Sequence, residues 1–183
     1  PDKLYDIYLK SVGRNAVLLL NIPPDRRGLI HERDISSLTA FRESLDRTFA
    51  TDLAKGATVT ASNTRGGKKG FSPQGLVDDD PLTWWAADDT VGQAVIMLDP
   101  GREMTFDIIM LSEPVEYGQR ISRFRIETRA EGGWIPAFEG TTIGYKRLVR
   151  IPPVTTSRLR LVILEANNTP ALSRIGLFRS AGN

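Results

Sequence analysis

A short apolar run, Ala16-Val-Leu-Leu-Leu-Asn-Ile22, sets the strongest constraint on how this chain can fold. It stops at Pro23-Pro24, and such a run is typical of a strand that is buried on both faces of a parallel sheet. From Arg33 to Phe49, apolar residues recur three or four positions apart, which predicts an amphipathic helix. One strand and one helix cannot enclose a core, so residues 1–50 need partner elements from upstream. We therefore expect a piece of a longer protein, since the chain starts at Pro1 rather than Met.

The residue pattern changes after Lys55-Gly56, where short β-rich runs alternate with turns that contain Gly, Pro and Asp. Seven such runs without a long helical pattern predict an antiparallel β-sandwich. The expected division is a strand and helix over 1–50, a linker over 51–55 and a sandwich over 56–183. The runs are Ala57–Ser62, Ala94–Asp99, Thr105–Leu111, Arg123–Thr128, Lys146–Ile151, Ser157–Leu164 and Ile175–Phe178.

Cysteine and histidine usage excludes several kinds of site. The 183 residues contain no Cys and one His, His31. A disulfide scaffold, a thiolate zinc site, a Cys nucleophile and any site with two imidazoles are therefore excluded. His31 stands at the predicted helix start, and we interpret it as a surface or capping residue. No apolar run approaches the roughly 20 residues of a membrane span, so we expect no membrane partner.

Charge is unevenly distributed along the chain. Residues 1–117 carry 13 Lys/Arg and 18 Asp/Glu, a net of −5, whereas residues 118–183 carry 11 and 4, a net of +7. A basic C-terminal third can indicate nucleic-acid binding. However, Arg alternates with apolar residues in Ser122–Thr128 and Arg158–Val162, which places the arginines on the outer face of a sheet. No basic groove rich in aromatic residues accompanies them, so we expect no nucleic-acid partner.

Several motifs resemble two known families. Ser11–Asp25, followed by Arg26–Ile30, resembles the last strand and the helix of the catalytic (β/α)8 barrel in family 29 glycoside hydrolases, the α-L-fucosidases. Leu76–Trp85 and Val95–Gly101 resemble the discoidin-like (coagulation-factor type C) sandwich, of jelly-roll type, that is also found in family 32 carbohydrate-binding modules. Two further stretches resemble the fucosidase branch that acts on α-1,3/1,4 linkages: Glu113–Ile121 and Gly140–Leu148.

The resemblance implies that the chain is the C-terminal, non-catalytic part of a fucosidase. Enzymes of this family are retaining glycosidases with an Asp nucleophile and a carboxylic acid/base, both on earlier barrel strands. We therefore expect no catalytic residue here, no activity of this chain alone, and a catalytic barrel upstream as its partner. A bacterial protein that is secreted or periplasmic is implied. The alternative is a stand-alone carbohydrate-binding module for galactose- or fucose-bearing glycans.

The discoidin-like resemblance also implies a calcium loop. Asp78 would supply its carboxylate, Asp80 its carbonyl and Thr83 its side-chain oxygen to a structural Ca²⁺. Two positions depart from the family pattern: Asp79 replaces a Gly, and Arg174 replaces a Glu ligand on the last strand. Because a guanidinium repels a divalent cation, we expect no bound cofactor, with Arg174 paired to Asp78 and its neighbours in place of the ion.

Three tryptophans have different expected roles. Trp85 matches the family's buried Trp, and Trp134 is expected at the start of a strand as a core residue. Trp84 points to the opposite side from Trp85 if the two lie on a strand. It then either stacks on a sugar ring or packs against the missing barrel.

Polar residues in two loops each have more than one possible role. Asn63 and Arg65 lie in a Gly/Lys-rich loop and either hydrogen-bond a glycan or are simply solvated. The roles of Gln119 and Arg120 are also ambiguous, and contact with the catalytic barrel is the preferred interpretation.

Overall fold

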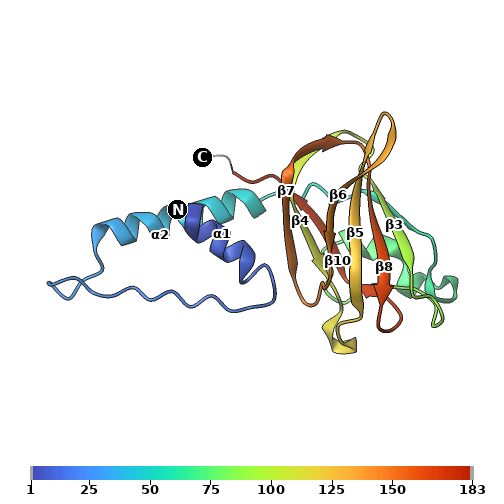
Figure 1. Cartoon of the computed structure of the whole chain (residues 1–183), viewed down its shortest axis with the longest axis horizontal. Coiled ribbons are helices and arrows are strands. Elements are labelled where there is room, and N and C mark those ends of the chain that lie inside the picture. Colours follow the sequence, from blue (N-terminus) through green and yellow to red (C-terminus); the bar gives the residue numbers. More distant parts are fainter. Residues whose placement is uncertain (1, 182–183) are drawn as a thin grey trace.

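The computed structural model describes residues 2–181, which form an arm of two helices beside a β-sandwich (Figure 1). The arm contains α1 (Asp2–Lys10), an extended segment and α2 (Glu32–Phe49). The sandwich contains β1 (Thr58–Ala61), β2 (Trp85–Ala86), β3 (Ala94–Asp99), β4 (Met104–Ser112), β5 (Ile121–Ala130), β6 (Gly133–Gly140), β7 (Arg147–Thr156), β8 (Leu159–Ala166), β9 (Ala171–Leu172) and β10 (Arg174–Phe178). Single 3-10 turns are η1 (Arg65–Gly67), η2 (Lys69–Phe71), η3 (Pro73–Val77) and η4 (Val115–Tyr117).

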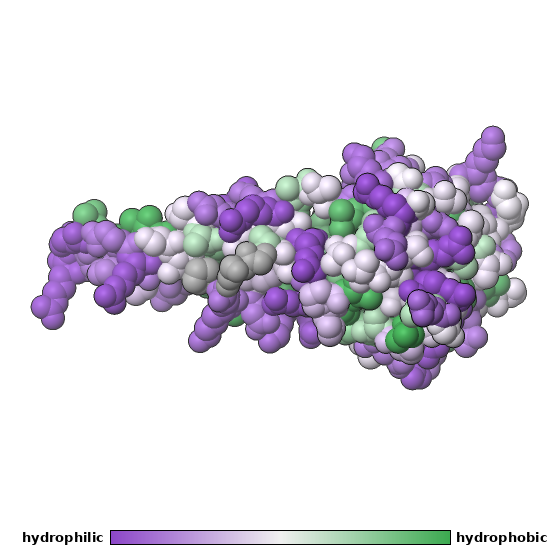
Figure 2. Space-filling model, turned by 90° about the horizontal axis from the view of Figure 1, so that it is seen from above, coloured by the Kyte–Doolittle hydropathy of each residue, from purple (hydrophilic) through white to green (hydrophobic). Residues whose placement is uncertain are grey.

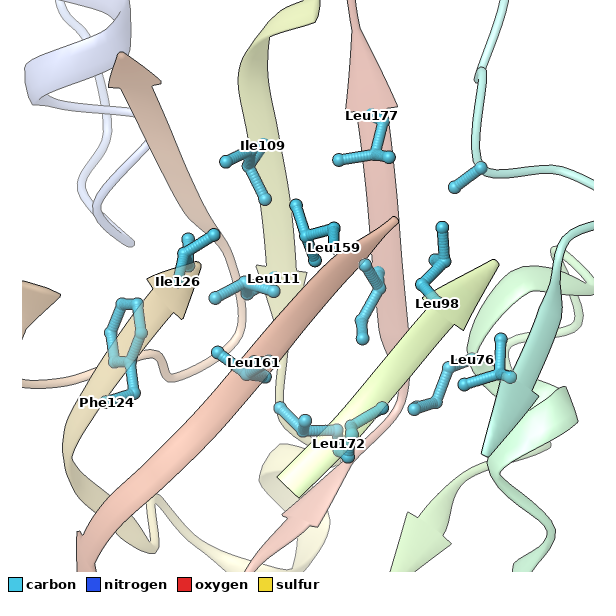
Figure 3. Close-up of a cluster of buried hydrophobic side chains, with 14 of the residues drawn as sticks. Leu76, Leu98, Ile109, Leu111, Phe124, Ile126, Leu159, Leu161, Leu172 and Leu177 are labelled. Carbon is cyan, nitrogen blue, oxygen red and sulfur yellow. The ribbon is translucent and has the colours of Figure 1, made fainter. Parts of the chain in front are cut away.

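Two antiparallel sheets face each other across one core. Five strands run in the order β1-β3-β8-β5-β6, and three run in the order β10-β4-β7, with β2 and β9 as a short separate pair. Side chains alternate in burial along β3, where Ala94, Ile96 and Leu98 point inward. Figure 3 shows leucine, isoleucine and phenylalanine side chains from both sheets meeting between them. The predicted antiparallel sandwich is confirmed.

All seven predicted β-rich runs overlap strands, namely β1, β3, β4, β5, β7, β8 and β10. One long strand, β6, was predicted only at its start, through Trp134. The structure corrects the core role of this residue, because Trp134 is only half-buried and packs under the Arg160 guanidinium, 4.6 Å from its ring centroid. β6 is interrupted by Pro136 and keeps Ile135 54% exposed, so its pattern resembles a loop. Pro lacks an N–H donor, and β6 tolerates it because this strand lies at the edge of the five-stranded sheet.

The three-stranded sheet is covered on both faces. Its outer face packs against the helices in a second core, in which Tyr5 and Leu9 of α1 meet Ile108, Met110, Leu148 and Phe178 of the sheet. The α2 residues Phe41, Leu45 and Phe49 pack against this cluster. The ring of Phe49 contacts that of Phe178, with centroids 5.0 Å apart. Helix α1 was missed from sequence, although Tyr5, Tyr8 and Leu9 have the spacing of a buried helix face.

The strand predicted over Ala16–Ile22 does not form within this chain, and this prediction is corrected. The segment runs extended, without regular strand pairing, and Val17 and Leu19 are each 92% exposed. A strand needs neighbours for its backbone hydrogen bonds, and the described residues supply a single bridge, between Arg14 and Arg147. Figure 2 shows green, hydrophobic residues along one edge of the arm, on an otherwise hydrophilic surface.

The predicted linker residues pack onto the sandwich. Ala54 is fully buried, and the Leu53 N–H donates to the carbonyl of Leu177 in β10 (2.8 Å). The Asp52 carboxylate accepts hydrogen bonds from the N–H groups of Ala54 and Leu177, both 2.9 Å. These contacts hold the arm against the sandwich, while the boundary at residues 51–56 stays a prediction.

Surface expectations are largely met. His31 caps α2 by accepting a hydrogen bond from the Arg33 N–H (3.1 Å), as predicted. On the outer face of the five-stranded sheet, Arg125 and Arg160 both pair with Glu127, whose side chain is only 4% exposed. The strand-face arginines are thus engaged in ion pairs. Within residues 2–181, no helix combines the length and apolarity needed to cross a membrane.

We predict that the helix arm and the sandwich unfold cooperatively. Replacing the buried Leu9 by Ala should lower the free energy of unfolding by about 2–5 kcal/mol, because it opens a cavity against the three-stranded sheet. The matched control is Leu29→Ala, since Leu29 is 59% exposed. Urea unfolding measures both. An unchanged midpoint for Leu9→Ala would mean that the second core contributes nothing to stability.

Candidate functional site

A groove at one end of the sandwich brings together several of the residues singled out from sequence. It encloses about 610 Å³ between the 79–84 loop, the 112–117 segment and the 145–146 turn. Asp80, Trp84 and Arg174 line it. Sequence reasoning missed Tyr117 and Tyr145, which are 48% and 69% exposed and also line the groove. Their signal was weak, because neither lies in a regular hydrophobic pattern.

Trp84 stands at the centre of an aromatic cluster. Its ring centroid is 4.7 Å from that of Phe71 and 4.8 Å from that of Tyr117. Trp85 points into the core and is fully buried, as predicted, and its indole N–H donates to the carbonyl of Asn63 (3.0 Å). The two tryptophans therefore divide into a core residue and a groove residue.

Glu113 fixes the two loops that form one wall of the groove. Its carboxylate is buried, and one oxygen accepts hydrogen bonds from the N–H groups of Arg120 (2.8 Å) and Ile121 (2.9 Å). The other oxygen accepts from Gly144 N–H at 2.6 Å. Gly144 has a φ of +68°, and a Cβ there would lie 2.5 Å from the Asn15 amide nitrogen. Only glycine fits this turn.

Asn63 and Arg65 make contacts within the chain beside the groove rather than lining it. The Asn63 carboxamide both donates to the Asp88 carboxylate (2.9 Å) and accepts from the Asp88 N–H (2.7 Å). Hydrogen bonds from Gly66 N–H and Asn63 hold the pKa of the Asp88 carboxyl below its ordinary value. Arg65 pairs with Asp89 and lies over the ring of Phe71. Their glycan-binding role stays a prediction.

Gln119 and Arg120 lie in the connection between β4 and β5, which flanks the groove. Arg120 donates to the carbonyls of Tyr117 (3.1 Å) and Thr169 (3.0 Å), and its guanidinium stacks over the Tyr117 ring. Gln119 is exposed. Arg120 therefore braces the groove wall, and barrel contact by the two residues stays a prediction.

The loop from Asp78 to Thr83 gathers several oxygens. The Thr83 hydroxyl lies 2.9 and 3.0 Å from the two carboxylate oxygens of Asp78, 3.0 Å from the Asp80 carbonyl and 3.2 Å from the Gly75 carbonyl. Asp79 has a φ of +64°, the left-handed conformation expected where the family has Gly. The loop thus has the predicted backbone shape.

Arg174 pairs with Asp79, which is a neighbour of the predicted Asp78, and with Asp52. Its guanidinium lies 2.5 Å from Asp79 and 3.2 Å from Asp52, whereas Asp78 bonds to Thr83 and to the Asp80 N–H. Lys55 adds a second cation, 3.4 Å from Asp79. The expected pairing with Asp78 is therefore corrected: Asp78 is used within its own loop, and Asp79 turns outward to reach Arg174.

The donor set does not fit a calcium ion. Ca²⁺ takes six to eight oxygens, usually including several carboxylates. The loop offers the oxygens of Gly75, Asp78, Asp80 and Thr83 with a single carboxylate among them. The side chain at position 174 is a cation, and no cluster of three or more acidic or histidine side chains that could hold a metal occurs among the described residues.

The sequence and fold of this chain match those of known proteins. A family model described as the F5/8 type C domain matches residues 58–177. Alpha-L-fucosidase 1 of Arabidopsis thaliana is 38% identical over 180 residues, covering 96% of this chain and 36% of that protein. The crystal structure of SpGH29 has a TM-score of 0.93 at 36% identity, covering 99% of this chain and 39% of that chain.

A GH29 fucosidase from Ruminococcus gnavus, in complex with fucose, has a TM-score of 0.89 at 37% identity, covering 98% of this chain and 37% of that chain. The chain thus spans little more than a third of the length of these relatives. The match extends over residues 1–57, outside the F5/8 type C region, so the helix arm is shared with the longer proteins as well.

We predict that Glu113 is essential to the groove. Glu113→Ala leaves three N–H donors without an acceptor and should lower the free energy of unfolding by at least about 2 kcal/mol. Glu116→Ala, at a nearby exposed site, should change it by no more than about 0.5 kcal/mol. Chemical denaturation followed by fluorescence compares them. Equal stability of the two variants would show that the carboxylate does not hold the loops.

Proposed function

The chain belongs to the F5/8 type C domain family, and from this premise we propose that it is the non-catalytic C-terminal part of an α-L-fucosidase, whose sandwich supports a catalytic barrel. In this proposal, the residues that break the glycosidic bond lie upstream of Pro1. The fucosidase names of the Arabidopsis thaliana and Ruminococcus gnavus relatives support the proposal. The loop motifs Glu113–Ile121 and Gly140–Leu148 favour action on α-1,3/1,4 linkages. Secretion or a periplasmic location and a bacterial source stay part of the proposal.

The main observation behind this proposal is the segment 16–22 between the two helices, whose apolar face has no partner within residues 2–181. Val17 and Leu19 are almost fully exposed, although burial of each side chain would contribute about 1.5–3 kcal/mol. The alternate residues Leu18 and Leu20 are half-buried, so the segment already has the two-sided character of a strand. The occupant that fits this apolar face is the rest of a barrel in the same polypeptide, since solved relatives match the segment within longer chains.

An unsatisfied buried N–H group at the junction supports the same partner. Arg14 and Arg147 form the backbone bridge that joins the arm to β7. The Arg147 Nε is buried and has no hydrogen-bond partner within residues 2–181. Burial and then repulsion from Arg14 lower the pKa of the Arg147 guanidinium. The buried Nε of Arg147 needs an acceptor, and an acidic group on the barrel would supply one.

The groove supports a second candidate function, carbohydrate binding by the sandwich. Trp84, Tyr117 and Tyr145 present aromatic surface around a hollow that also contains charged groups. Sites of this composition, apolar walls with a few polar groups, suit small ligands. A galactose- or fucose-bearing glycan is the proposed ligand of this alternative.

Arg174 replaces calcium in the proposed account of the Asp78–Thr83 loop. The guanidinium neutralises Asp79 and Asp52, and it connects the loop, the 52–55 segment and β10 without an ion. The support is the donor set, because a cation stands at position 174, where the family pattern has a Glu ligand.

A hydrolysis assay tests the main proposal. The 183-residue chain should release nothing from an aryl α-L-fucoside, while the longer protein that contains it should turn the substrate over.

Calorimetry of this chain with fucosylated glycans then separates the two roles of the sandwich. A purely supporting role predicts no heat of binding. Millimolar or tighter binding that weakens in Trp84→Ala, but not in Trp134→Ala, would establish the carbohydrate-binding alternative. Turnover by the 183-residue chain would refute the assignment of catalysis to the upstream part.

Thermal melting tests the calcium account. The wild-type melting temperature should be the same in EDTA and in excess calcium. Arg174→Glu should melt lower in EDTA, because it places a third carboxylate beside Asp52 and Asp79, and calcium should restore several degrees. Lys68→Glu makes the same charge change on an exposed loop and should show no calcium response. A calcium-induced rise of several degrees in the wild-type chain would contradict the replacement.

A further inference from the structure

One polar side chain interrupts the exposed face of the arm's extended segment. Val17, Leu19 and Asn21 are exposed, whereas Leu18, Leu20 and Ile22 are half-buried. In an extended chain, side chains two positions apart point to the same side. The face that turns away from the helices therefore reads Val, Leu, Asn along the chain.

The direction of the segment orders these three residues in space. Gly13 and Asn15 are bonded to the sandwich, through Leu148 N–H to the Gly13 carbonyl (2.7 Å) and Asn15 to Ile143 (3.1 Å). From there the segment runs away from the sandwich toward the start of α2 (Figure 1). Six residues of extended chain cover about 20 Å, so Asn21 lies at the far end. Val17 and Leu19 lie nearer the sandwich.

A barrel strand uses its inward side chains differently at its two ends. The inward face of a (β/α)8 barrel consists of layers of apolar side chains, and active sites lie at the carboxyl ends of the strands. Val17 and Leu19 suit the apolar layers. Asn21, just before the carboxyl end of the strand, suits the polar floor of the substrate site instead.

The chemistry of Asn21 requires partners. A carboxamide has two N–H donors and one carbonyl acceptor, and burial of such a group without hydrogen bonds costs several kcal/mol. Apolar barrel layers cannot satisfy it, whereas the hydroxyl groups of a sugar can both accept from it and donate to it. The chain directly after the strand is also rigid, because Pro23 and Pro24 are followed by a turn in which Asp25 accepts from Arg27 N–H (2.8 Å).

We propose that Asn21 lines the sugar-binding end of the catalytic barrel and hydrogen-bonds the fucosyl group of the substrate. This inference rests on the proposed function, since it places residues 16–22 in the barrel of an α-L-fucosidase. It makes this chain a contributor of one substrate-contacting side chain, although the groups that break the bond lie elsewhere.

Kinetics of the longer protein test the inference. With an aryl α-L-fucoside, Asn21→Ala should lower kcat/KM by at least about tenfold and should raise the inhibition constant of free fucose by a similar factor. A loss of sugar contact lowers kcat/KM and raises the inhibition constant of fucose together, whereas a folding defect lowers the active fraction, and with it kcat/KM, without changing fucose affinity. Asn167→Ala, in an exposed turn of the sandwich, should leave both quantities unchanged.

The variant's folding is checked on the 183-residue chain. Asn21 is exposed there, so Asn21→Ala should melt at the wild-type temperature. If the longer variant does not fold, Asn21→Asp, which keeps the shape but removes the donors, decides by the same two constants. Wild-type kcat/KM and fucose inhibition in a folded Asn21 variant would overturn the inference. A wild-type longer protein without any fucosidase activity would instead overturn the proposed function.

Discussion

The structure depends on one sheet that is buried on both faces. Most of β4 is inaccessible, because alternate side chains enter the sandwich core and the remainder meet the helices. Ile109 and Leu111 belong to the first core, Ile108 and Met110 to the second. A single strand thus joins two hydrophobic clusters, and any movement of the arm relative to the sandwich disturbs both. The close-packed interior of proteins transmits such strain over short distances.

The same dual burial explains what sequence could and could not predict. Strands that alternate, such as β3, were predicted with nearly correct bounds, because one face of each strand is the core. Beyond Trp134, Pro136 breaks the alternating pattern of β6, so the rest of this strand was not predicted. Helix α1 was missed because it is too short for a strong helical pattern. The apolar segment 16–22 was predicted as a strand, but within this chain it runs extended without strand pairing, because the described residues offer it no neighbouring strands. Local pattern identifies an element's buried face, and only tertiary contact decides what covers that face.

The groove shows a similar division between residue type and geometry. The family pattern correctly placed Asp79 in a left-handed turn and Trp85 in the core. It named Asp78 and its neighbours as partners of Arg174 without deciding between them, because Asp78 and Asp79 are adjacent and only the turn decides which of them faces β10. Glu113 went unassigned for another reason. A buried carboxylate that binds backbone N–H groups has no sequence signal beyond its charge, since its partners are loop amides 7, 8 and 31 residues away.

The placement of the unpartnered segment has a consequence for the order of events during synthesis. Proteins emerge from the ribosome N-terminus first, and upstream domains generally fold first. A barrel that takes its last strand from residues 16–22 has two open edges until this segment emerges. The helices that hold the segment contact each other through Tyr8 and Phe41, but their buried residues pack against β4, β7 and β10, which are made later still. In the proposed longer protein, the upstream barrel would then close only after the sandwich has folded. Folding of the C-terminal part would be the last step in the assembly.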